Sequence, residues 1–347
     1  MIPSHGVRLH LLLRPYGGRV LIYSIRRILV SIPVLLLASF LVFWLVSFSR
    51  DPVREVLGAR NPPVPPAVIQ AEYQRLGLHD GFFAQYWHWL RRLVWDQDFG
   101  PSILPGTSIN GEIGERLVTT LRLIVLAVIV SLVLAVVTGV LSAVRQYSKT
   151  DYSLTFAGFV LLSMPVFWVA VLLKQAGVVF NESTGTRYIF TFGEKSQGVD
   201  LTGMANALDI AGHLVLPTLS LALLNYAALS RFQRSSMLEV LESDYLRLAR
   251  AKGLRRWQVL IRHGVRTALI PMTTVSGLLI GGLIGGAVVT ETVYGWNGMG
   301  KLLIDAIRLG DRNVIMAWLL LAGTAVVLFN LIADLMYAVL DPKIRYR

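Results

Sequence analysis

Six long, uncharged apolar blocks constrain the fold of this chain more than any other feature. They cover residues 28–48, 123–144, 152–173, 214–230, 269–290 and 314–333. A helix of about 20 residues, rising 1.5 Å per residue, crosses the roughly 30 Å hydrocarbon core of a bilayer. Only 16% of the 347 residues are charged, whereas soluble proteins carry about a quarter. The sequence therefore predicts an all-α integral membrane protein with six transmembrane helices.

The net charge of +12 indicates how the chain is oriented in the membrane. With the amino terminus inside, residues 1–27, 145–151, 231–268 and 341–347 are cytoplasmic and hold 19 of the 33 lysines and arginines. The external segments 49–120, 174–213 and 291–313 are nearly twice as long and hold 13, and Arg122 lies at the edge of a block. This bias follows the positive-inside rule, so we expect both termini in the cytoplasm. The basic charge then reports topology, and we predict no binding of nucleic acid.

These observations divide the chain into five parts. The predicted parts are a basic cytoplasmic segment (1–24), a first transmembrane helix (25–48), a long extracytoplasmic loop (49–120), a five-helix core (121–340) and a cytoplasmic tail (341–347). The core contains the one long cytoplasmic loop, residues 231–268. The long external loop contains a proline-rich stretch at 61–66, which predicts a stiff extended spacer.

Aromatic and apolar residues recur at helical spacing later in the same external loop. They are Phe83, Tyr86, Trp87, Leu90, Leu93 and Val94. Tyrosine and tryptophan favour the headgroup region of a bilayer, so the pattern predicts a short helix at the outer interface. Such a helix could dock an external partner or simply pack on the bundle, and the residues alone favour neither.

No catalytic or metal-binding motif emerges from the sequence. The chain has no cysteine, and its six histidines show no ligand spacing. Residues 295–302 imitate a phosphate-binding loop, but Leu302 stands where that motif requires serine or threonine. An apolar block rather than a buried strand also precedes them. We therefore predict no catalytic residue, metal or cofactor on this chain.

The cytoplasmic loop 231–268 is the most informative segment. Two apolar stripes flank Gly253, namely Leu238, Leu241, Tyr245 and Leu248 before it and Leu254, Trp257, Ile261 and Val265 after it. Glycine readily takes the left-handed conformation that ends a helix, so the pattern predicts helix, turn and helix. Nine lysines or arginines decorate this hairpin. Its basic amphipathic character suits either anionic lipid or a soluble cytoplasmic subunit.

Two further positions stand out in or directly after the apolar blocks. Asp334 directly follows the last block, about one turn inside the expected membrane boundary. Snorkelling to the interface is the default interpretation of such a carboxylate, but its position also suggests a structural or gating partner. Pro165, after Met164, interrupts the third block. A proline there can break a helix where a path must form, although prolines near helix starts are also ordinary.

Five segments, taken in order, resemble a known family. Residues 25–53, 76–102, 244–271, 291–311 and 334–346 are similar to the inner-membrane subunits of bacterial binding-protein-dependent ABC importers, in the dipeptide/oligopeptide/nickel group. The last segment and the long first external loop favour the B-type permease subunit. The chain departs from the general pattern of the coupling loop in carrying Arg247, where that pattern begins with glutamate. It also has Asn297 where relatives usually have proline.

The resemblance implies a type I ABC importer permease fold in the bacterial inner membrane. It implies a coupling helix that inserts into a cytoplasmic ATPase, with the expected contacts Asp244, Tyr245, Arg247, Ala249, Arg250, Ala251, Lys252 and Gly253. Candidates for the substrate path, by position, are Phe167, Trp168, Asn225 and Glu291.

The resemblance also implies partners for this chain. They are a second, C-type permease subunit, two cytoplasmic ABC ATPase subunits and an extracytoplasmic peptide-binding protein, within membrane lipid. ATP and Mg²⁺ would bind the ATPases, and this chain would be no enzyme. The expected substrates are di- and oligopeptides. The alternatives are nickel or another small solute, or an ATP-independent channel or scaffold.

Overall fold

The computed structural model describes residues 17–48, 51–58, 64–104 and 106–340. Within these residues the chain is helical, and its extended pairing is an isolated bridge between Pro101 and Ser108. The predicted tail 341–347 and most of the predicted basic segment 1–24 lie outside the described residues. So do residues 61–63 of the spacer predicted at 61–66, whose last residue, Pro66, begins a helix.

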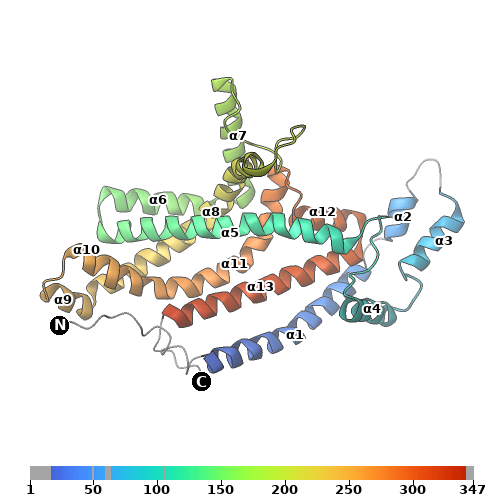
Figure 1. The fold of residues 1–347 in the computed structure, drawn as a ribbon, viewed down its shortest axis with the longest axis horizontal. Coiled ribbons are helices and arrows are strands. Elements are labelled where there is room, and N and C mark those ends of the chain that lie inside the picture. Colours follow the sequence, from blue (N-terminus) through green and yellow to red (C-terminus); the bar gives the residue numbers. More distant parts are fainter. Residues whose placement is uncertain (1–16, 49–50, 59–63, 105, 341–347) are drawn as a thin grey trace.

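Five long helices form the body of the molecule (Figure 1). They are α1 (Gly17–Ser47), α5 (Ile109–Val144), α8 (Gly203–Glu242), α11 (Arg266–Tyr294) and α13 (Arg312–Leu340). α5 packs along α8, α11 packs against both α8 and α13, and α1 covers α13. α1 begins at Gly17, several residues before the predicted start at residue 25, so the helix includes part of the expected basic segment.

Apolar length supports four of these helices as membrane spans among the described residues. The spans are Ile22–Ser47, Ile109–Val144, Gly203–Glu242 and Arg312–Leu335. The predicted fifth block falls inside α11, which is 29 residues long. The all-α membrane fold is therefore confirmed, whereas the count of six spans is not fixed by these helices alone.

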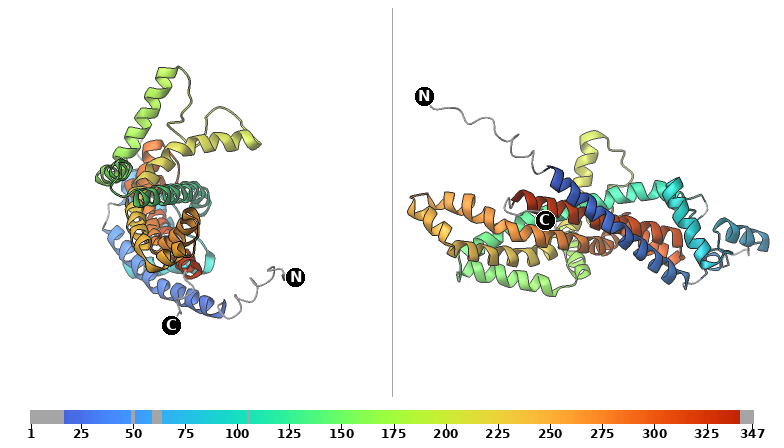
Figure 2. Two further views of the ribbon diagram at one scale, coloured as in Figure 1. Left: turned by 90° about the vertical axis from the view of Figure 1, so that its left-hand side faces the viewer. Right: turned by 90° about the horizontal axis from the view of Figure 1, so that it is seen from below.

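The third apolar block is not one straight helix. It divides into α6 (Lys149–Ser163) and α7 (Val166–Thr184), whose axes are bent by 110°. Pro165 has no N–H to continue the helix, and it forces the preceding Met164 into an extended conformation. As a result of this bend, α7 and the start of α8 project away from the long helices (Figure 2).

The short helices gather at the two opposite ends of the long ones (Figure 1). One end carries α2 (Pro52–Leu57), α3 (Pro66–Arg75), α4 (Phe82–Arg91), the π-helix η1 (Arg92–Asp96) and α12 (Met299–Leu309). The other end carries α9 (Asp244–Ala251), α10 (Arg256–Gln258) and the π-helix η2 (Val259–Val265). The helix predicted around 83–94 is thus confirmed as α4 and η1.

α4 divides its aromatic residues between two faces. Trp89 is buried against Phe43 of α1 and Met316 of α13, whereas Phe83 and Trp87 are exposed. One face of α4 therefore packs on the bundle, as one of the two interpretations expects. The other face is uncovered and could dock an external partner, as the second interpretation expects.

The partner expected for Asp334 lies on the neighbouring helix. Arg27 of α1 forms an ion pair with Asp334 of α13, and the Tyr23 hydroxyl donates a 2.9 Å hydrogen bond to the same carboxylate. This polar contact joins the two helices near the end that carries α9, where α1 starts and α13 finishes (Figure 1).

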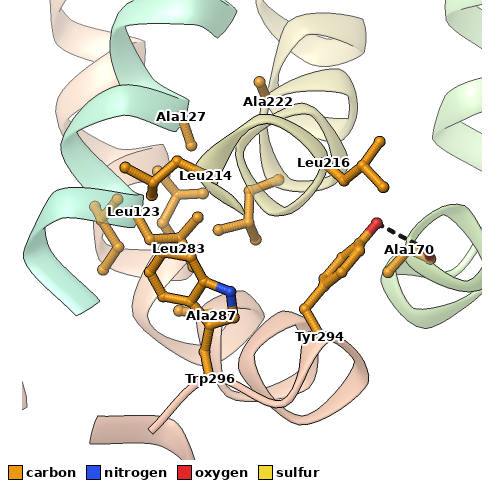
Figure 3. Packing of buried hydrophobic residues seen from close by; sticks show 12 residues of the cluster. Leu123, Ala127, Ala170, Leu214, Leu216, Ala222, Leu283, Ala287, Tyr294 and Trp296 are labelled. Carbon is orange, nitrogen blue, oxygen red and sulfur yellow. Dashed lines mark hydrogen bonds between the residues drawn. The ribbon is translucent and has the colours of Figure 1, made fainter. Parts of the chain in front are cut away.

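The largest apolar cluster lies where α5, α7, α8 and α11 meet (Figure 3). Tyr294 and Trp296, at the end of α11, are almost completely buried in it. The Tyr294 hydroxyl contacts Ser220 Oγ of α8 at 2.8 Å and donates to the Ala170 carbonyl of α7 at 3.0 Å. The cluster therefore attaches the projecting helix α7 to the body.

Candidate functional site

The helix α9 is held to the bundle by one face. Leu246 is fully buried and Ala249 is 9% exposed, and both pack in a cluster with Met237 and Val240 of α8. Ala249 was expected to contact a partner, but it lies on this inner face. Its small side chain instead allows α9 to approach the chain's own helices closely.

The opposite face of α9 is uncovered. Tyr245 and Leu248 are 44% and 56% exposed, and Trp257 just beyond the turn is 69% exposed. The remaining expected contacts are also exposed, namely Asp244, Arg247, Arg250, Ala251, Lys252 and Gly253. Apolar side chains therefore alternate with cationic ones on a surface that the chain itself leaves open.

Gly253 ends this helix in the predicted way. Its φ is +77°, in the left-handed region, and its N–H donates to the Arg250 carbonyl at 3.0 Å. An added Cβ would meet nothing within 4 Å, so the requirement for glycine is conformational rather than steric. The predicted sequence of helix, glycine turn and helix is confirmed by α9, Gly253 and α10.

A buried ion pair fixes the helices behind α9. Asp151, in the first turn of α6, is 2% exposed and accepts two hydrogen bonds of 2.8 Å from Arg234 Nε and Nη2 of α8. Ser142 of α5 donates to the same carboxylate, and the Tyr147 N–H does so at 2.9 Å. Bidentate pairs of this kind are geometrically specific. We call Asp151, Arg234 and Ser142 the inner clamp, because they tie three helices together.

Sequence reasoning did not find the inner clamp. Asp151 and Arg234 are separated by 83 positions, so no local period relates them. The available signal was that both fall in predicted cytoplasmic segments beside spans, where an acid among basic residues calls for a partner.

At the other end, Glu291 caps a helix rather than lining an open path. Its side chain is fully buried at the end of α11, and its carboxylate accepts hydrogen bonds from the N–H groups of Gly300 at 2.7 Å and Lys301 at 3.2 Å. These groups open α12, whose N-cap residue is Gly298 and has no side chain to satisfy them. Thr120 of α5 also donates to the carboxylate. The expectation that Glu291 lines a substrate path is therefore not met in this conformation.

A second carboxylate holds the same turn from outside the bundle. Glu194, in the loop between α7 and α8, accepts a 2.6 Å hydrogen bond from the Asn297 N–H and one of 3.3 Å from Thr119. Lys174 of α7 donates to the Val293 carbonyl at 2.6 Å. The turn at 293–298 is thus bonded to α7 and to the α7–α8 loop, and through Glu194 it is connected to α5. We call Glu291, Glu194 and their partners the outer turn.

The remaining path candidates do not form one site with Glu291. Phe167 and Trp168 are about half exposed, near the start of α7. Asn225 is half-buried in α8, and its Nδ2 donates to the Leu221 carbonyl at 2.9 Å. Among the described residues, no hydrogen bond or ring contact joins any two of the four candidates.

Comparison with known proteins identifies what this arrangement resembles. The family model described as "Binding-protein-dependent transport system inner membrane component" matches residues 135–346, and the model of its N-terminal region matches residues 20–110. One similar relative is the oligopeptide transport system permease protein OppB of Mycobacterium tuberculosis H37Rv. It is 41% identical over 324 residues, which cover 93% of this chain and 98% of the relative.

Other relatives are similar over nearly their whole length. The oligopeptide transport system permease protein AppB of Bacillus subtilis 168 is 39% identical, with 93% of this chain and 99% of the relative covered. The glutathione transport system permease protein GsiC of Escherichia coli K12 is 34% identical, with 94% and 99% covered.

A solved structure shares the fold. A chain of the inward-facing MetNI methionine ABC transporter superposes with a TM-score of 0.53 at 16% identity, covering 67% of this chain and 98% of that one. At this identity the likeness concerns the arrangement of the helices.

Proposed function

The chain belongs to the binding-protein-dependent transport system inner membrane component family of ABC importer permeases, and from this premise we propose that it carries di- and oligopeptides across the bacterial inner membrane. The single observation that supports the peptide substrate is the relatives' naming. Proteins 34–41% identical over 93–94% of this chain are named for oligopeptide, dipeptide and glutathione transport.

In this proposal α9 is the contact with a cytoplasmic ATPase. Tyr245 and Leu248 supply apolar area, and Arg247, Arg250 and Lys252 supply charge around it. An interface of this composition buries its apolar centre and leaves a polar rim. ATP and Mg²⁺ bind the ATPases, and this chain hydrolyses nothing itself. A second permease subunit completes the path, and an extracytoplasmic binding protein delivers the peptide.

The inner face of α9 provides the transmission. A push on α9 reaches α8 through Leu246 and Ala249, which pack on Met237 and Val240. The inner clamp then carries the displacement to α5 and α6, because Arg234 of α8 is bonded to Asp151 and Ser142. Alternating access requires helices to move as connected groups around the substrate site. The proposal also puts both termini in the cytoplasm, because α1 starts and α13 finishes at the end that carries α9.

The contact with the ATPase is tested by changing the exposed face of α9 alone. In a complex reconstituted with its permease, ATPase and binding-protein partners, Leu248→Asp should abolish the ATPase stimulation caused by peptide-loaded binding protein. Arg91→Gln, an exposed residue of α4 at the opposite end, is the matched control and should leave stimulation unchanged. Equal stimulation in the wild type and the Leu248→Asp complex would disprove the contact.

The substrate is tested separately by uptake. Cells that depend on this importer should accumulate labelled di- and oligopeptides, and deleting the chain should abolish that uptake while leaving labelled nickel uptake as it was. Unchanged peptide uptake in the deletion strain would rule out the peptide proposal but would not affect the ATPase contact.

A further inference from the structure

A cavity of about 240 Å³ lies at the end of the molecule that carries α4, between that helix, α3 and the junction of α12 with α13. Figure 1 shows α4 beside the end of α1 and the start of α13. Arg312, Arg92 and Trp89 line this cavity, and Phe43 of α1 closes one side. None of the functions proposed above uses it.

In the part of the chain that the structure describes, two arginines of this lining have no acidic partner, and a buried tryptophan N–H has no acceptor. Half-buried Arg312 donates to Gln85 Oε1, and its guanidinium lies 4.9 Å from the centre of the Phe43 ring. Among the described residues, no carboxylate lies within 4.0 Å of Arg312 or Arg92. Trp89 is 4% exposed, and its Nε1 has no hydrogen-bond partner there.

The carboxylates of the lining do not balance these donors. Asp311 is buried, and it accepts from the Ser102 hydroxyl at 2.6 Å and from two backbone N–H groups at 2.8 and 3.2 Å. Asp80 is exposed to solvent at the rim, as is His88. A third arginine of the lining, Arg75, is already paired with Glu72, whose hydrogen bond raises the pKa of that guanidinium. Buried polar groups normally have hydrogen-bond partners. The charges of Arg312 and Arg92, which no carboxylate of the described residues neutralises, and the unbonded Trp89 N–H therefore favour an anion in the cavity.

The position of the cavity identifies the source of that anion. Phe43 and Val46 lie near the end of the span Ile22–Ser47, and Arg312 is the first residue of the neighbouring span Arg312–Leu335. The donors therefore lie at the depth where two adjacent spans leave the hydrocarbon, which is the level of the phospholipid phosphates.

An apolar groove lies beside the cavity, between the end of α1 and the start of α4. It has a volume of about 610 Å³ and is lined by Phe40, Leu41, Trp44, Phe48, Phe82 and Phe83. The Phe82 ring, which lines the groove, is 5.6 Å from the Phe43 ring, which lines the cavity. A polar cavity and an apolar groove separated by a single layer of rings match the two parts of one lipid molecule.

We propose that this end of the chain binds an anionic phospholipid, with the phosphate among Arg312, Arg92 and the Trp89 N–H and an acyl chain in the groove. A soluble phosphate would use the cavity and leave the groove empty. A carboxylate from a partner protein would approach from the aqueous side, and it would leave the groove unexplained. In the topology proposed above the lipid belongs to the outer leaflet.

The test is native mass spectrometry of the full importer complex in detergent, with dioleoylphosphatidylglycerol or dioleoylphosphatidylcholine added. We expect retention of phosphatidylglycerol, and we expect Arg312→Gln and Arg92→Gln each to weaken it by about tenfold. Trp89→Phe keeps the ring and removes the N–H, so it should weaken retention by a smaller factor. Arg91→Gln is the matched control, since Arg91 is exposed on α4 and does not line the cavity, and it should bind like the wild type.

Any one of four results would overturn the proposal. The first is equal retention of the two lipids by the wild type, and the second is an equal loss in Arg91→Gln. The third is that Arg312→Gln weakens binding of the extracytoplasmic binding protein in lipid-free detergent while phosphatidylglycerol retention stays unchanged. Glycerol 1-phosphate is the soluble probe, and displacement of the lipid by it at equal concentration would assign the site to free phosphate. If Arg312→Gln fails to assemble, Arg92→Gln and Trp89→Phe decide the question.

Discussion

The two ends of the molecule differ in how completely the chain satisfies its own polar and apolar groups. At the outer turn, two carboxylates and Lys174 bond to backbone groups of residues 293–301, and Trp296 and Tyr294 are buried. At α9, the inner face is equally well packed, but Leu248 and Trp257 remain exposed. The chain itself bonds and buries the groups of the outer turn, whereas it covers only one face of α9. Substitutions at the outer turn should therefore lower the free energy of unfolding. Substitutions on the exposed face of α9 should instead reduce the proposed coupling to the ATPase.

The largest effect on stability is expected at the inner clamp, which lies behind α9. Asp151→Ala removes the carboxylate that Arg234 contacts through two hydrogen bonds and leaves a partly buried charge without its partner. Breaking such a pair typically costs about 3–5 kcal/mol. The measurement is the midpoint of denaturant unfolding of the purified subunit in detergent.

A double variant separates the charge from the packing. Asp151→Leu with Arg234→Met removes both charges and should recover most of the loss, because it leaves no uncompensated ion. If Asp151→Ala alone costs less than about 1 kcal/mol, the inner clamp does not hold the three helices together.

At the outer turn the two carboxylates should differ in their contribution. Glu291→Ala leaves the first N–H groups of α12 and the Thr120 hydroxyl without an acceptor, so we expect a loss of about 2 kcal/mol. Glu194 is only half-buried, so Glu194→Ala should cost less than about 1 kcal/mol. The same unfolding experiment compares them, and a larger loss in Glu194→Ala would reverse the assignment of the cap.

Tyr294→Phe tests a single hydroxyl within the apolar cluster. The ring keeps its packing, while the contacts with Ser220 and the Ala170 carbonyl are lost. We expect a loss of about 1 kcal/mol. Ser220→Ala is the control, since it removes only one of the two contacts and should cost less. An unchanged unfolding midpoint in Tyr294→Phe would show that this hydroxyl does not contribute to the attachment of α7.

The smallest effect on stability is expected on the exposed face of α9. Tyr245→Ser with Leu248→Ser should change the free energy of unfolding by no more than about 0.5 kcal/mol, because neither side chain is buried in the chain. Leu246→Ser is the matched control on the inner face and should destabilise the subunit by several-fold more. If the exposed pair lowers the free energy of unfolding as much as Leu246→Ser does, the two faces of α9 do not differ in their contribution to stability.

Much of the fold could be predicted because it depends on local patterns. Apolar length predicted four of the spans, aromatic spacing predicted α4, and Gly253 marked the end of α9 through its backbone conformation. The orientation of α9 could not be predicted, since apolar residues occur on both faces and only tertiary packing selects Leu246 as the buried one. For the same reason, the sequence did not indicate that Ala249, expected to contact a partner, lies on the inner face of α9.

The outer turn shows why site residues were harder to predict than helices. Glu291 was chosen for its position at the end of an apolar block, which suggests a polar group near a path. Its partner groups are backbone N–H groups of α12, and they need it because Gly298 has no side chain. In the sequence, the lack of an N-cap side chain is visible only as Gly298 before the helix. The carboxylate that takes its place belongs to another helix, α11.

The uncovered face of α9 has a consequence for the life of the protein in the cell. If α9 is the ATPase contact proposed above, a newly made copy that has not met its ATPase presents Leu248, Trp257 and their cationic neighbours to the cytoplasm. Proteases and chaperones act on exposed apolar surface, and modest differences in exposure change protein abundance several-fold. We therefore expect surplus permease subunits to be degraded until their number matches the supply of ATPase, so that assembly itself sets how many importers the membrane contains.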